Sequence, residues 1–66
     1  MDEYTCTFVV VSKAQSTIDD GVTQFITVVE STSAELSGAT TLTTTDPDTD
    51  AFFTQNGNYT ATLVAD

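Results

Sequence analysis

The sequence predicts an all-β protein, a small antiparallel sandwich or open barrel of four to five strands. Threonine occurs at fifteen positions, many of which alternate with apolar residues. Such β-branched side chains suit a pleated surface with one face in water. Asp-Gly and Asn-Gly pairs also stand between apolar segments, which is typical of β-hairpin turns. We expect residues 1–66 to form a single small β domain, because a chain this short buries too little surface for two cores.

The first half of the chain predicts a β-hairpin from residues 4–18 to residues 22–31. One face of the first strand carries Tyr4, Cys6, Phe8 and Val10, and its later part is apolar on both faces, as in a covered strand. Asp-Gly at positions 20–21 readily supplies the positive φ angles of a tight turn.

The middle of the chain carries weaker signals. Residues 32–35 have the spacing of a capping box, so they predict either one helical turn or a loop. Residues 39–45 predict a threonine-rich strand with Leu42 as its single large apolar residue, which indicates a sheet edge. Residues 46–48, Asp-Pro-Asp, predict a turn.

A second hairpin is predicted at the end of the chain. Residues 52–55 would form its first strand, Asn-Gly at 56–57 its turn, and residues 58–64 its return strand. The return strand alternates cleanly, with Tyr59, Ala61 and Leu63 on one face.

The charge balance excludes several functions. Ten acidic residues face one basic residue, Lys13, and histidine is absent, so the formal net charge is −9. Such a surface repels nucleic acid and anionic lipid, which argues against direct binding of either. General acid–base catalysis usually needs histidine or a carboxyl group buried in a deep pocket, and a thin 66-residue domain has little room for one. We therefore expect no enzymatic activity.

No targeting segment is expected. The chain begins Met-Asp-Glu, where a secretory signal would carry basic residues, and the longest apolar run, residues 8–11, is too short to span a bilayer. The sequence therefore favours a protein made in a host cytoplasm, from which any place outside the cell, such as a virion, would be reached by lysis or assembly.

The acidic segment Asp46, Asp48 and Asp50 is a weak candidate for a metal site. Its spacing matches the opening of a calcium loop, which collects several carboxylate oxygens. However, Ala51 stands where that loop needs glycine, and Gly57 stands where it needs a bidentate glutamate. The pattern favours a solvated turn; no cofactor is expected, and calcium is the one ion it would suit.

Cys6 and Lys13 have structural interpretations. Cys6 is the single cysteine, so it forms no disulfide within the chain, and no cationic side chain stands near it in sequence to activate a thiolate. We expect it to be a small buried apolar residue. Lys13 is expected to pair with a nearby carboxylate or to lie in solvent.

Two functions remain open. The first is a structural protein that docks on a larger symmetric assembly or forms a homo-oligomer. A minor virion component of a virus or phage, such as a capsid-decorating protein or a tail subunit, is the leading form of this hypothesis. Phe52, Phe53 and, more weakly, Tyr59 are its predicted docking residues, because adjacent aromatic groups beside a turn cannot all face the core. The alternative is an acidic inhibitor that imitates nucleic acid and occupies a basic groove, although the acidic residues fall in separate turns rather than in one row.

Overall fold

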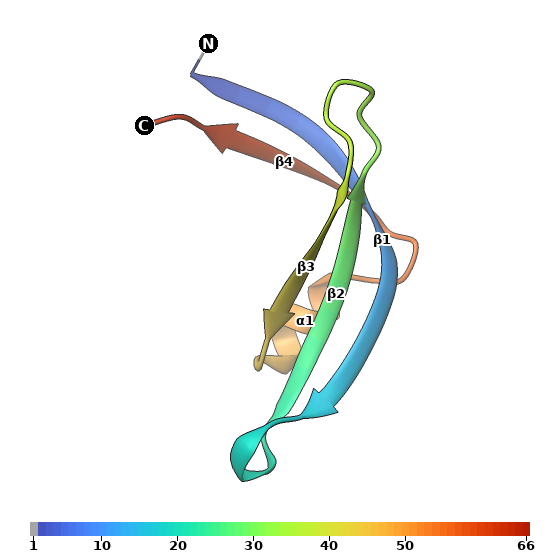
Figure 1. Ribbon diagram of the computed structural model, residues 1–66, viewed down its shortest axis with the longest axis vertical. Helices are drawn as coiled ribbons and strands as arrows, with labels where there is room; N and C mark the ends of the chain where they lie inside the picture. The colour runs from blue at the N-terminus through green and yellow to red at the C-terminus, as the bar shows by residue number, and fades with distance from the viewer. Residues whose placement is uncertain (1) are drawn as a thin grey trace.

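The fold is one four-stranded antiparallel sheet with a short helix on one side, described for residues 2–66 by a computed structural model (Figure 1). Across the sheet the strand order is β3-β2-β1-β4. The predicted all-β antiparallel class is confirmed, and the four strands belong to a single sheet. The elements, in chain order, are β1 (Glu3–Thr17), β2 (Thr23–Ser31), β3 (Ala39–Thr44), α1 (Pro47–Phe52) and β4 (Asn58–Val64).

The first predicted hairpin is confirmed. β1 and β2 pair antiparallel, from Phe8 opposite Ser31 to Thr17 opposite Thr23. The loop between them contains a single 3-10 turn, in which Asp20 and Gly21 have φ angles of 64° and 76°. The Asp-Gly pair thus supplies the left-handed backbone that the connection needs, as the sequence predicts.

The second predicted hairpin is wrong. β4 pairs with the first half of β1, from Glu3 opposite Val64 to Val9 opposite Asn58, so the paired residues are 49 to 61 positions apart in the chain. Residues 52–55 cannot form a strand because α1 runs to Phe52 and a turn follows it. The Asp-Pro-Asp segment is likewise the start of this helix rather than an isolated turn.

The connection from β2 to β3 is a loop. Residues 32–38 contain bends and no helical turn, so the loop alternative of the sequence analysis is confirmed there. The Ser31 hydroxyl donates a hydrogen bond to the Leu36 carbonyl and accepts one of 3.2 Å from the Ser33 N–H. These local bonds compete with the helical pattern that the capping-box spacing suggests. β3 ends one side of the sheet, which confirms its prediction as an edge strand.

A β-bulge at Val11 changes the faces of β1. Val10 lies opposite Val29, but Ser12 lies opposite Val28 and Lys13 opposite Thr27. One extra residue on β1 therefore shifts the alternation by one, since residues directly opposite each other share a face. As a result Lys13 lies on the same face as Val10, which is the face that α1 covers.

The buried core is small. Within residues 2–66, nine large apolar side chains remain exposed, from Tyr4 at 38 % to Val64 at 66 %. Single exposed apolar side chains are ordinary on protein surfaces, so only those that gather into one patch indicate a contact site. No helix among the described residues is long and apolar enough to cross a membrane. Across residues 2–66 the buried side chains are Cys6, Val10, Thr27 and Val29.

Candidate docking groove

The site begins with the helix α1, which local sequence signals fix in place. Asp46 is its N-cap, and its carboxylate accepts hydrogen bonds from the N–H groups of Asp48 (3.4 Å) and Thr49 (3.3 Å) and from the Thr49 hydroxyl (2.6 Å). Pro47 follows at the first helical position, where its missing N–H costs nothing. The hydroxyl of Thr49 and the two N–H groups lower the pKa of Asp46 below its usual value of 3.8.

This cap predicts a specific pH dependence. A carboxyl group whose pKa is lower in the folded than in the unfolded protein stabilises the fold at pH values above its unfolded-state pKa. This contribution is lost as the pH falls through its folded-state pKa. We expect the difference in urea midpoint between wild type and Asp46→Asn to be constant near neutral pH and to shrink below pH 3.8. Asp48→Asn is the matched control, because it removes a carboxylate from the same turn without removing the cap. A difference that does not change with pH would contradict the prediction.

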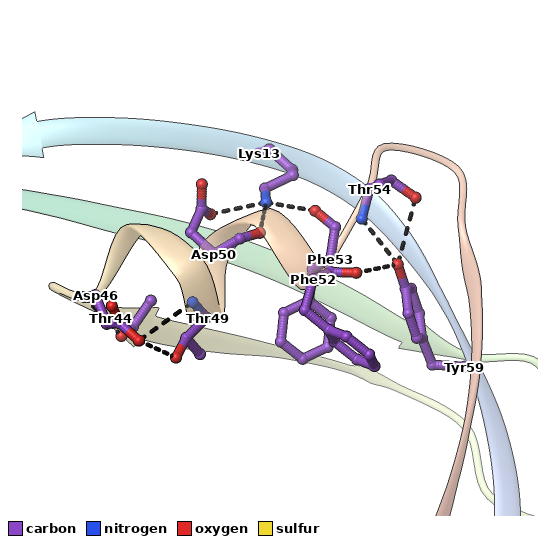
Figure 2. A network of polar contacts seen from close by, with 9 residues as sticks. All are labelled: Lys13, Thr44, Asp46, Thr49, Asp50, Phe52, Phe53, Thr54 and Tyr59. Atoms are coloured by element: carbon purple, nitrogen blue, oxygen red, sulfur yellow. Dashed lines mark hydrogen bonds and ion pairs between the residues drawn. The ribbon is translucent and has the colours of Figure 1, made fainter.

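Lys13 holds the other end of α1. Its ammonium group donates to the carbonyl oxygens of Asp50 (2.6 Å) and Phe53 (2.5 Å), and it lies 2.7 Å from Asp50 Oδ1 (Figure 2). The contact with Oδ1 is an ion pair rather than an aligned hydrogen bond. Both side chains are about one-fifth exposed, so water screens the pair only partly. The predicted pairing of Lys13 with a carboxylate is confirmed, and the cation also satisfies carbonyl groups at the helix C-terminus.

The three predicted docking residues form one aromatic cluster. Ring centroids are 5.0 Å apart between Phe52 and Phe53, and Tyr59 lies 5.2 Å from each. The Tyr59 hydroxyl donates to the Phe52 carbonyl (2.7 Å) and accepts from the Thr54 N–H (2.9 Å), so β4 is tied to the end of α1 (Figure 2). The hydroxyl and N–H of Thr54 lower the pKa of Tyr59, and Lys13 adds a smaller electrostatic effect.

The cluster forms one wall of an apolar groove of about 370 Å³ on the face that α1 covers. Phe52 is the most exposed aromatic side chain in it, with 64 % of its surface accessible. Few polar atoms line the groove, so it suits an apolar side chain more than a polar substrate. Besides the three rings, its lining consists of residues from all four strands: Phe8, Val29, Thr40, Leu42, Thr60 and Ala61.

The acidic segment before the groove does not gather as a ligand set. Asp46 caps the helix and Asp50 pairs with Lys13, so two of the three carboxylates already have partners. Within residues 2–66, no group of three or more His, Cys, Asp or Glu side chains is arranged to hold a metal ion. Cys6 is buried at 2 % exposure, as predicted.

Two features of the site escaped the sequence analysis. Asp46 followed by Pro47 is a helix-start signal, and it would have located α1 had it been weighed against the turn prediction. The role of Lys13 has no such local signal. It depends on the bulge at Val11, without which Lys13 would lie on the opposite face of the sheet from α1.

The fold and groove define a small single-sheet β protein with an exposed aromatic cluster. Searches against protein-family models, curated proteins and solved structures find no match to this chain.

Proposed function

We propose that this protein is a non-enzymatic structural subunit that docks on a larger assembly through the aromatic groove. The assembly we favour is a virion, with the chain as a minor component such as a capsid-decorating or tail protein. The observation that carries the proposal is the exposed apolar groove beside a very small buried core. A partner that covers the groove would supply the apolar burial that a 66-residue chain lacks by itself.

The construction of the groove supports docking over catalysis. Its walls are mostly aromatic and aliphatic, with two threonines and no charged residue. The ion pair of Lys13 and Asp50 lies at the end of α1, where it holds the helix. Tyrosine and phenylalanine are enriched in the buried centres of protein interfaces, and tyrosine is among the residues that most often dominate binding energy. Tyr59 is held by two hydrogen bonds, so little conformational entropy would be lost when a partner packs against it.

The arrangement of charge favours docking over imitation of nucleic acid. A DNA mimic needs a dense row of carboxylates on one face. Here the exposed acidic residues come from the two chain ends, the first hairpin loop, the β2–β3 region and the start of α1. A docking contact made by apolar groups should also survive a rise in salt, whereas a charge mimic should lose its target steeply.

The proposal is tested by gradient sedimentation of a lysate of the source, with the chain followed by a specific antibody. We expect wild type to sediment with particles far larger than 7.0 kDa, in low and in high salt. Phe52→Asp should remain at the top of the gradient, because a charge in the groove opposes apolar docking. Leu36→Asp is the matched control, since Leu36 is an exposed apolar residue in the distant β2–β3 loop. Equal sedimentation of both variants with the particles would contradict the proposal, as would a free wild-type chain.

A further inference from the structure

In the part of the chain that the structure describes, no strand lies beside the outer edge of β4. β4 ends the sheet, so one edge pairs with β1 and the other has no partner strand within residues 2–66 (Figure 1). Natural edge strands are usually protected by lysine, proline or a bulge. The sequence of β4, Asn-Tyr-Thr-Ala-Thr-Leu-Val, has no charge, proline or glycine, and its paired register has no shift. This edge is therefore open to strand addition.

The other edge strand, β3, is a poorer candidate. It is also uncharged, but its single large apolar residue is Leu42. β4 instead presents Leu63 and Val64 at 55 % and 66 % exposure. A strand placed beside β4 would therefore cover more apolar surface than a strand placed beside β3.

The two ends of β4 differ in chemistry. Near its start, Tyr59 and Ala61 line the aromatic groove. Near its end, Leu63 and Val64 line a second hollow of about 360 Å³, which Asp2 and Glu3 also line. An added strand would thus meet apolar groups at one end and carboxylates at the other.

Charge decides between a second copy and a different protein as the source of this strand. Lys13 is mostly buried against Asp50, so every charged side chain that is exposed within residues 2–66 is a carboxylate. A second copy would bring another net charge of −9 to the contact. Like charges oppose such an approach, whereas basic residues on a partner would be attracted.

We propose that the docking partner is a different protein that adds one β-strand to the free edge of β4. One apolar side chain of that strand occupies the groove, and lysine or arginine residues lie near Asp2 and Glu3. Backbone hydrogen bonds hold the strand, and the two ends of β4 set its register, as in other cases of strand addition. This inference rests on the proposed docking function and names the chemistry of its partner.

Two synthetic, end-capped nine-residue peptides provide the probe. Both alternate threonine and valine around a central phenylalanine, and they differ in carrying two lysines or two glutamates at one end. Amide hydrogen exchange of the labelled full chain is measured by NMR with each peptide. We expect the lysine peptide to slow exchange at alternate amides of residues 58–64, because only amides that point away from β1 gain a partner. The glutamate peptide should bind at least about tenfold more weakly.

Matched variants locate the contact. Asn58→Lys with Thr62→Lys places two charges on β4, at positions that alternate with Tyr59 and Ala61 and do not line the groove. This double variant should weaken binding of the lysine peptide by about tenfold, since edge lysines oppose strand addition. Thr41→Lys with Thr43→Lys makes the same change on β3 and should leave binding unchanged.

Several results would overturn the inference: no binding of the lysine peptide, equal binding of both peptides, or protection confined to β3. Concentration-dependent protection of β4 without any peptide would identify a second copy as the occupant and would also overturn it. The docking function can fail separately. If Phe52→Asp leaves the chain on the large particles while the peptide protects β4, docking through the groove is wrong. The inference that β4 accepts an added strand is then retained. If Phe52→Asp releases the chain but β4 gains no protection, only the strand-addition inference is wrong.

Discussion

Lys13→Met should lower the free energy of unfolding by about 1.5–3 kcal/mol, the range for hydrogen bonds to a charged group. The ammonium group serves two carbonyl oxygens and one carboxylate at the C-terminal end of α1, and both members of the ion pair are largely shielded from water. Its removal leaves Asp50 without its cation. Methionine keeps much of the length and apolar stem of lysine, so the effect reports the lost charge rather than a cavity. Urea unfolding measures it.

The same substitution should release α1 from the sheet. Phe52 is the last residue of α1 and Phe53 follows it, so the aromatic cluster depends on where the helix lies. We expect amide exchange in α1 to accelerate before that in the β1–β2 ladder, because the helix is short and makes few contacts with β2 and β3.

Asp50→Asn distinguishes the effect of the ion pair on stability from the effect of the overall net charge. Lys13→Met raises the net negative charge and Asp50→Asn lowers it, yet both break the same contact. If the contact matters, both variants are destabilised, and the double variant loses less than the sum of the two. A stabilised Asp50→Asn protein would mean that charge repulsion, rather than the ion pair, governs the stability of this region.

Local sequence patterns were sufficient to predict most of the strands. The hairpin of β1 and β2, the edge strand β3 and the alternation in β4 all have signals within a few residues, and the structure has each of them. The aromatic residues chosen for the docking site also lie together, although their partner-binding role remains a proposal. The prediction assumed strand alternation at residues 52–55. The rings instead come together because Phe52 and Phe53 lie at the end of α1, beside Tyr59 of β4.

The features that could not be predicted depend on distant pairing. Nothing near residues 58–64 specifies β1 as their partner, while Asn56-Gly57 offers a local hairpin that competes with it. In the structure Asn56 has a φ of 66°, but its N–H donates to the Val10 carbonyl (2.9 Å), so the turn residues join the ladder to β1. The bulge at Val11 lies where these contacts converge, since the Gln55 side chain donates to the Val11 carbonyl (2.9 Å).

Gly57→Ala should be the second severe substitution, with an expected loss of about 2–3 kcal/mol, at the upper end of the range for overpacking. A Cβ at this position would lie 2.7 Å from the Thr54 hydroxyl oxygen and 3.0 Å from both the Thr54 carbonyl oxygen and Tyr59 Cε2. The hydroxyl could rotate away. The Thr54 carbonyl and the Tyr59 ring cannot move easily, because the Tyr59 hydroxyl is hydrogen-bonded to the Thr54 N–H and to the Phe52 carbonyl. Relief therefore requires the Tyr59 ring to shift, which alters the wall of the groove.

Gly38→Ala provides the comparison that separates this steric effect from general destabilisation. Gly38 has a φ of 130°, and a Cβ added to it would meet no atom within 4 Å, so alanine there strains the backbone without touching the groove. Both variants should unfold at lower urea concentrations, but only Gly57→Ala should move the NMR signals of the Tyr59 and Phe52 rings. Equal ring signals in the two variants would show that the groove tolerates the extra carbon. In that event the position of the Tyr59 ring would not depend on the close approach of Gly57. The hydrogen bonds of the Tyr59 hydroxyl alone would fix it.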